Sequence, residues 1–158
     1  MTDLSRPSLF PAAAEAATRL LRVVILDDVS GALEAIKMVI QRRFSNATIL
    51  TFTKPEEALQ ELERQKPDLF TTDWCHPDPS GAEILRRLAA KKVGYPVFVI
   101  SARAEIPWVE RAVKEAKLQG LNIALLSKPF LIEELWRLMA EHLRLPAGDA
   151  NKTTKSGE

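Results

Sequence analysis

Short apolar runs alternate with segments of helical periodicity through most of the chain. Five runs are brief and mostly apolar, which predicts strands, and the β-branched run of residues 23–26 is short enough for a strand that is buried on both faces. After each run, apolar residues recur at intervals of three and four, which predicts five amphipathic helices. The predicted strands cover residues 23–26, 47–52, 69–72, 97–100 and 123–126.

This alternation predicts an α/β fold in which one five-stranded parallel sheet carries helices on both faces. Parallel strands need crossover connections, and these are almost always right-handed. The expected architecture is therefore doubly wound, with five βα units in sequence. In such sheets ligands bind at the carboxyl ends of the strands.

Local signals mark several helix boundaries. Ser30 is expected to cap the first helix, and the segments Thr53–Glu56 and Ser80–Glu83 both have the sequence of a capping box. Pro107 is expected at the start of the fourth helix and Gly120 at its end.

Length and composition fit one globular domain. The chain has 158 residues, of which 46% are hydrophobic and 27% charged, so it can bury a core of its own. We expect one folded domain over residues 21–145, preceded by an arm over residues 1–20. Residues 146–158 are expected to be a disordered tail, because they lack apolar anchors.

Charge and cysteine content narrow the class of protein. The net charge of +1 gives no support to direct binding of nucleic acid or of an anionic membrane. A single cysteine cannot form an intramolecular disulfide, and no apolar run approaches the roughly 20 residues of a membrane span. We therefore expect a cytoplasmic protein.

Polar residues stand at the ends of four predicted strands. Asp27 and Asp28 follow the first strand, Asp73 the third, Ser101 the fourth and Lys128 the fifth. Carboxylates that lie this close need a cation or a raised pKa, and a set of oxygen ligands suits Mg²⁺. An ammonium and a hydroxyl facing an ionised acid could hold a phosphoryl group. Asp73 is then interpreted as a nucleophile.

These residues occur in a familiar order. An acidic pair is followed by Asp73-x-x-x-Pro77-x-x-x-Gly81, then Ser101-Ala102, then Lys128-Pro129-Phe130. Over about residues 22–145 the sequence resembles the receiver domain of two-component response regulators, of the kind found in chemotaxis regulators. The resemblance implies a flavodoxin-like (βα)5 receiver fold.

The resemblance also implies a role for each site residue. Asp73 would be the phospho-acceptor, Ser101 would bond a phosphoryl oxygen and Lys128 would pair with the phosphoryl group. Asp28, Asp73 and the backbone carbonyl of Cys75 would bind Mg²⁺ directly, and Asp27 would act largely through water. The Lys128-Pro129 peptide is expected to be cis.

A receiver of this kind would be a signalling switch and not an enzyme in the ordinary sense. Its implied phosphoryl donor is a histidine kinase or a histidine phosphotransfer protein. Its implied output is a changed affinity for a downstream protein or for a second copy of the chain. The expected contact face comprises the fourth helix, the fifth strand and the last helix, with Trp108 and Trp136 if they are exposed.

The chain departs from the family pattern at several positions. His76 replaces the usual methionine, which a loop position should tolerate. Leu125 stands where an aromatic switch residue is common, so coupling is expected to run through the 102–106 loop and the helix after it.

Other interpretations of the same residues stay open at this stage. Asp73 could simply cap a turn, and Cys75-His76 could suggest zinc, although two adjacent ligands cannot complete a tetrahedral site. The chain could be a receiver-like scaffold that takes no phosphate, or a phosphatase with an aspartyl-phosphate intermediate. Gly81 is expected to serve backbone conformation and His142 to be solvated.

Overall fold

The computed structural model describes residues 20–76 and 78–143, and these form a sheet of parallel strands alternating with helices. The strands are β1 (Arg22–Leu26), β2 (Thr48–Phe52), β3 (Leu69–Thr72), β4 (Val97–Ser101) and β5 (Ile123–Ser127). The helices are α2 (Ser30–Arg43), α3 (Pro55–Arg64), α4 (Gly81–Ala90), α5 (Pro107–Leu118) and α6 (Ile132–His142). The predicted five βα units are confirmed, with strand bounds within one residue of the expectation.

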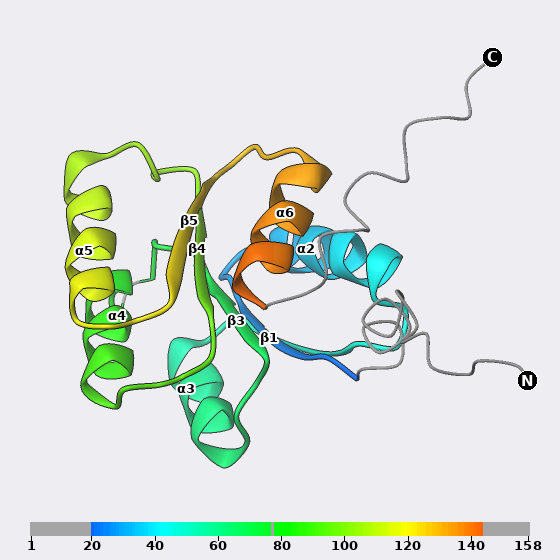
Figure 1. Cartoon of the computed structure of the whole chain (residues 1–158), viewed down its shortest axis with the longest axis horizontal. Coiled ribbons are helices and arrows are strands. Elements are labelled where there is room, and N and C mark those ends of the chain that lie inside the picture. The colour runs from blue at the N-terminus through cyan, green and yellow to red at the C-terminus, as the bar shows by residue number, and fades with distance from the viewer. Residues whose placement is uncertain (1–19, 77, 144–158) are drawn as a thin grey trace, which may run out of the picture.

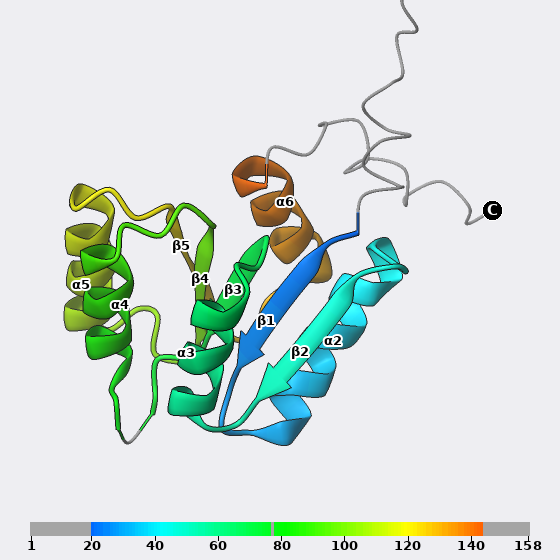
Figure 2. The same ribbon diagram turned by 90° about the horizontal axis from the view of Figure 1, so that it is seen from below.

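The five strands are ordered β2-β1-β3-β4-β5, and every neighbouring pair is parallel. Helices α3, α4 and α5 cover one face of the sheet, and α2 and α6 cover the other (Figures 1 and 2). The order reverses where β1 is flanked by β2 and β3, so loops diverge from the carboxyl ends of β1 and β3. In sheets of this kind, such a divergence opens a crevice for a ligand.

The sheet divides the core in two. In β1, Val24 and Leu26 belong to the cluster under α3, α4 and α5, whereas Val23 and Ile25 belong to the cluster under α2 and α6. All four side chains are at most 1% exposed. A strand buried on both faces must be apolar at every position, which explains the continuous apolar run in the sequence.

The helix starts agree only partly with the predicted caps. Ser30 is the first residue of α2 and the preceding Val29 is the cap, so the predicted serine cap is wrong. The box predicted over Thr53–Glu56 is also wrong, because Lys54 is the cap of α3 and makes no side-chain bond, although Pro55 does occupy the first turn. Backbone geometry and the proline start these helices without a capping side chain.

At α4 half of the predicted capping box forms. The Ser80 hydroxyl accepts a hydrogen bond from the amide of Glu83 at 3.3 Å. The Glu83 carboxylate pairs instead with Arg86 at 2.8 Å and Arg87 at 3.4 Å, so its charge is used along the helix surface.

Helices α4 and α5 end in the same backbone motif with different residues. At the end of α5, Gly120 has a φ of 97°, and its amide and that of Leu121 bond back to the last turn. At the end of α4, Lys92 takes the equivalent place with a φ of 52°. Glycine is favoured there because a Cβ is crowded in the left-handed region, so Lys92 is the unusual choice.

The last helix packs more tightly than expected at its end. His142 was predicted to be solvated, and this is wrong: its Nδ1 lies 2.6 Å from the Asn122 Oδ1, and its ring packs edge-on against Phe98 at 5.4 Å. Burial lowers the pKa of His142, because a charged ring would lose hydration there. The indole of Trp136 donates to the Val39 carbonyl at 3.0 Å and ties α6 to α2.

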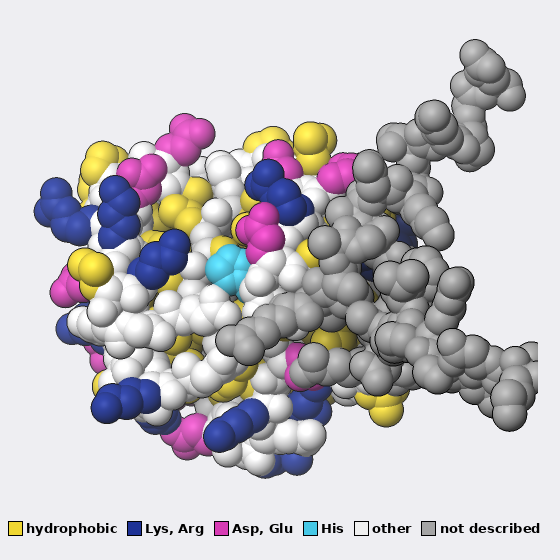
Figure 3. Space-filling view, in the orientation of Figure 1, with side chains coloured by type: hydrophobic (Ala, Val, Ile, Leu, Met, Phe, Trp, Pro, Cys, Tyr) yellow, Lys and Arg dark blue, Asp and Glu magenta, His cyan; other side chains and the backbone are white. Residues whose placement is uncertain are grey.

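The surface of the described residues mixes charges of both signs. On the face seen in Figure 3, basic and acidic side chains are interspersed and neither forms a continuous patch. None of the described helices is long and apolar enough to cross a membrane. The predicted tail and all but the last residue of the predicted arm lie outside the described residues.

Candidate phosphoryl-transfer site

Three carboxylates meet at the carboxyl edge of the sheet. Leu26 of β1 lies beside Thr72 of β3, so the residues that follow, Asp27 and Asp73, leave the sheet side by side. Together with Asp28 they place carboxylate oxygens within 4.8 Å of one another. Asp27 is buried, Asp73 is half-buried and Asp28 is exposed, so the cluster opens to solvent on one side.

Asp27 is the most constrained of the three acids. It is 1% exposed, and its Oδ1 accepts a hydrogen bond from the amide of Val29 at 2.9 Å. Its Oδ2 lies 2.6 Å from the Nζ of Lys128, in an ion pair between residues 101 positions apart. A carboxylate this buried needs such partners, because it has lost its hydration. The structure therefore gives Asp27 a direct contact with Lys128, beyond the water-mediated role expected from the sequence.

Asp73 is held by its own loop. Its amide donates to the Leu26 carbonyl at 3.0 Å, which extends the β1–β3 pairing by one residue. Its Oδ1 accepts from the amide of Trp74 at 2.7 Å. One oxygen of the carboxylate is thus fixed by the backbone, which sets the direction of the side chain.

The hydroxyl and the lysine meet at the neighbouring strand ends. Ser101 is the last residue of β4 and is paired with Ser127 of β5. The Ser101 carbonyl accepts from the amide of Lys128 at 3.0 Å, and its hydroxyl accepts from the amide of Arg103 at 3.1 Å. The fold therefore gathers Asp27, Asp28, Asp73, Ser101 and Lys128 at one edge. The Lys128-Pro129 peptide is cis, as predicted.

The loop after Asp73 contains a buried polar contact that the sequence did not reveal. His76 is only 7% exposed, and its Nε2 lies 3.1 Å from the Thr72 hydroxyl, which donates to the Asp73 carbonyl at 2.9 Å. His76 is thus packed beneath the loop and is not a tolerant loop position. No pattern in the sequence pairs Thr72 with His76, because the contact depends on how the loop folds back.

Gly81 serves close packing and not a special backbone conformation, contrary to the prediction. A Cβ at this position would lie 2.7 Å from the Trp74 carbonyl oxygen and 2.9 Å from its ring. The start of α4 can therefore lie directly on the residue that follows Asp73. Trp74 is half-buried and packs against the core cluster under α3 and α4.

Among the described residues, the acids Asp27, Asp28 and Asp73 form the one cluster with three or more potential metal-ligating side chains. Cys75 is half-buried and free, and together with His76 it belongs to no such group. The donor set at the sheet edge consists of oxygen atoms, which suits a hard divalent cation such as Mg²⁺ and not zinc.

Comparison with known proteins decides the family. The profile of the response regulator receiver domain matches residues 23–140. The chain belongs to this family. The chain spans only about half the length of the curated relatives that it matches.

Two of these relatives are regulatory proteins from bacteria. The probable transcriptional regulatory protein TcrX of Mycobacterium tuberculosis is 28% identical over 116 residues, which cover 72% of this chain and 45% of TcrX. The phosphate regulon transcriptional regulatory protein PhoB of Pseudomonas aeruginosa is 28% identical over 141 residues, which cover 85% of this chain and 57% of PhoB.

Solved receiver domains share the fold. A CheY-like response regulator receiver domain protein from Methanospirillum hungatei superposes with a TM-score of 0.68 at 21% identity, covering 80% of this chain and 95% of that chain. The receiver domain of a LuxO repressor protein from Vibrio parahaemolyticus gives a TM-score of 0.67 at 22% identity, covering 80% and 92%.

Proposed function

We propose that this receiver domain is a signalling switch that accepts a phosphoryl group on Asp73. The observation that carries the proposal is the joint placement of three carboxylates within 4.8 Å and the Lys128 ammonium beside them. The proposed donor is the phosphohistidine of a histidine kinase or phosphotransfer protein, and the proposed place of action is the cytoplasm.

The transfer would proceed by attack of an Asp73 carboxylate oxygen on the phosphorus atom. The bond between phosphorus and the donor's imidazole nitrogen breaks, and the electron pair returns to the imidazole, which then takes a proton. The product on the receiver is an aspartyl phosphate. Because the Trp74 amide holds Oδ1, the other oxygen of Asp73 is the better placed nucleophile.

The acid cluster fits Mg²⁺ by its chemistry. Asp28, Asp73 and the backbone carbonyl of Cys75 would hold the ion, with Asp27 contributing through water. Bound Mg²⁺ would supply the positive charge that offsets both the carboxylates and the phosphoryl oxygens. Lys128 is already anchored at this edge by Asp27, and turning from Asp27 toward the phosphoryl group would add a second positive charge.

The Ser101 hydroxyl offers a way to convert phosphorylation into a change of shape. Its bond to the Arg103 amide holds the loop that precedes α5. A phosphoryl oxygen that competes for this hydroxyl would favour another loop conformation and would shift α5 with it. The proposed output surface is therefore α5, β5 and α6, where Trp108 at the start of α5 is 63% exposed. A downstream protein or a second copy of the chain would bind there.

Intact-mass spectrometry after incubation with acetyl phosphate would test the chemistry. We expect one added phosphoryl group with Mg²⁺, a large loss without it, and none in Asp73→Asn. Asp78→Asn is the matched control, because Asp78 is an exposed acid five residues away and should not matter. Phosphate that stays on Asp73→Asn, or that is lost in Asp78→Asn, would contradict the assignment.

Hydrogen exchange would test the output surface separately. Beryllofluoride, which stands in for the phosphoryl group on an aspartate, should change the exchange of residues 102–126. Changes confined to α2 would show that the proposed surface is wrong.

A further inference from the structure

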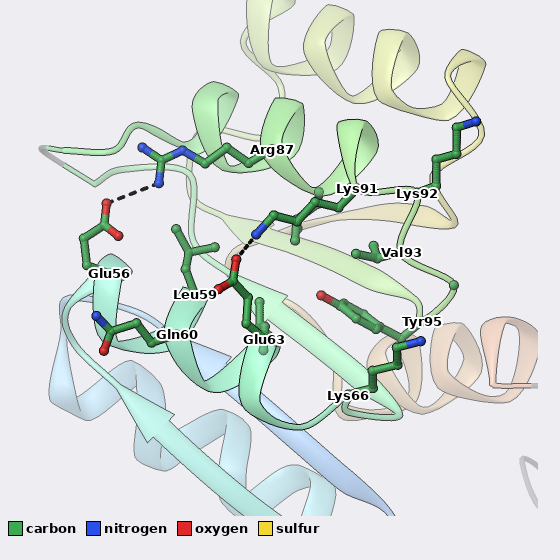
Figure 4. Close-up of a pocket in the computed structure, with 13 residues that line it drawn as sticks. Glu56, Leu59, Gln60, Glu63, Lys66, Arg87, Lys91, Lys92, Val93 and Tyr95 are labelled. Atoms are coloured by element: carbon green, nitrogen blue, oxygen red, sulfur yellow. Dashed lines mark hydrogen bonds and ion pairs between the residues drawn. The ribbon is translucent and has the colours of Figure 1, made fainter.

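A cavity lies between α3 and α4, away from the acidic site (Figure 4). Its volume is about 400 Å³, which is within the range of pockets that hold small molecules. Tyr95, just before β4, closes one end, so this end lies at the amino edge of the sheet, opposite to Asp73. Part of the lining is apolar. This part, called the apolar floor below, consists of the aliphatic side chains of Leu59, Leu62, Leu88 and Val93.

Two ion pairs join the helices across this cavity. Glu56 of α3 pairs with Arg87 of α4 at 3.2 Å, and Glu63 of α3 pairs with Lys91 next to the end of α4. Figure 4 shows both pairs spanning the space above the apolar floor. The rim of the cavity is thus charged and its interior is apolar.

The rim carries more positive than negative charge. Four basic side chains line it against two acidic ones, which leaves an excess of two positive charges. Lys66 and Lys92 supply the excess, since neither forms an ion pair with a described residue. They lie on opposite sides of Tyr95 in Figure 4, with the Lys92 ammonium turned outward. The flexible lysine stem allows that ammonium to swing over the opening.

Lys92 occupies its position at a conformational cost. It holds the left-handed backbone position that Gly120 holds at the end of α5, although glycine is the favoured residue there. A non-glycine residue kept in such a conformation suggests that its side chain has a use. At Lys92 the available use is a positive charge beside the cavity.

Tyr95 adds a neutral hydrogen-bond donor. Its side chain is 8% exposed, and Figure 4 shows its hydroxyl pointing into the cavity. Among the described residues the hydroxyl has no hydrogen-bond partner, and it is not one of the fully buried unpartnered atoms, so a ligand can reach it from the cavity. Burial, and to a lesser degree the charge of Glu63, raises the pKa of Tyr95 to about 12, so the hydroxyl stays protonated at neutral pH.

We propose that this cavity binds a small organic phosphate monoester with an aromatic body. The dianionic phosphate would match the two uncompensated lysines and accept the Tyr95 hydroxyl bond, and the ring would lie on the apolar floor between α3 and α4. The site is separate from Asp73 and does not depend on the phosphorylation proposed there.

Titration of the full chain, followed by amide NMR, would test the site with two probes, phenyl phosphate and adenosine monophosphate. We expect saturable shifts in residues 59–66 and 87–95. Lys66→Gln and Lys92→Gly should each weaken binding about fivefold to tenfold, since each removes one charged partner of the phosphate. Lys92→Gly keeps the helix end intact because glycine suits that backbone. Lys114→Gln, on the exposed surface of α5, is the matched control and should leave binding unchanged.

Two comparisons make the outcome decisive. Inorganic phosphate should bind much more weakly than phenyl phosphate, and equal shifts at equal concentration would overturn the role of the apolar floor. Binding should persist in Asp73→Asn, and shifts that vanish there or centre on residues 73–76 would place the ligand at the acidic edge and refute the cavity. A loss of affinity in Lys114→Gln equal to that in Lys92→Gly would also refute it.

Discussion

Replacing Lys128 by methionine should destabilise the domain, because it removes the cation that faces Asp27. Methionine is close to lysine in length and carries no charge, so the change isolates the ammonium. Asp27 is 1% exposed and would retain one hydrogen bond, from the amide of Val29. Among the described residues, Lys128 is the one cation that pairs with this carboxylate.

The size of the effect follows from the burial of the two partners. Breaking a buried ion pair by removing one member costs about 3–5 kcal/mol. The Lys128 side chain is 23% exposed, so water can enter when the ammonium is gone, and we take the lower end, about 3 kcal/mol. For a chain of this size that loss lowers Tm by roughly 10 °C. Asp27→Asn together with Lys128→Met removes both charges and should recover about 2 kcal/mol of this as coupling energy.

Urea unfolding at pH 7 in the absence of divalent cations, followed by circular dichroism, would measure the four proteins of this cycle. Far-ultraviolet signals of the single and double variants should match the wild type, which separates a loss of stability from a loss of fold. A destabilisation of Lys128→Met below about 0.5 kcal/mol, or a coupling energy near zero, would refute the ion pair as drawn.

Three further predictions concern other parts of the molecule. Gly81→Ala should cost about 2 kcal/mol, because its Cβ would meet the Trp74 carbonyl at 2.7 Å, as urea unfolding would show. Stability should fall as the pH drops below 6.5, since burial lowers the pKa of His142 and the unfolded chain takes up the proton first. Thermal unfolding of the wild type and of His142→Gln at a series of pH values would measure how much of this loss His142 causes. Mg²⁺ at ten times its Kd should add about 1.4 kcal/mol, and Asp28→Asn should lose most of that gain.

Each of these has its own control and contrary outcome. Gly94→Ala adds a methyl group where nothing lies within 4 Å, so an equal loss there would rule out the Trp74 clash. The wild type and His142→Gln should differ in stability by an amount that changes with pH, and parallel profiles would show that His142 is not the titrating group. Equal stabilisation of Asp28→Asn by Mg²⁺ would place the ion elsewhere.

Strands β1, β3 and β4 were predictable from the sequence because a strand buried on both faces is a short, continuous apolar run. Every position of Val23–Leu26 must be apolar, and no exposed strand or loop imposes that rule. Helix starts were less predictable. Ser30 and Thr53 have the right chemistry for capping, but the chain reaches both helices in a geometry that places the cap one residue away from them.

The site was predictable in its members and less so in their contacts. Carboxyl ends of parallel strands share one edge, so residues after β1, β3, β4 and β5 had to meet. Which oxygen Lys128 contacts depends on side-chain conformation, and the sequence alone does not define it. His76 was misjudged for a related reason: a loop residue is normally exposed, and only the folded loop shows it turning in to reach Thr72.

The ion pair between Asp27 and Lys128 also bears on when the site can form during translation. It joins the end of the first strand to the end of the last, across 101 positions in the chain. When β1 to β4 of a nascent chain have emerged from the ribosome, all three carboxylates of the cluster are present but Lys128 is not. Domains generally fold as units, so the complete edge forms only when β5 takes its place beside β4. A chain truncated before Lys128 would therefore lack this contact, and the proposed switch would require translation to have passed the end of β5.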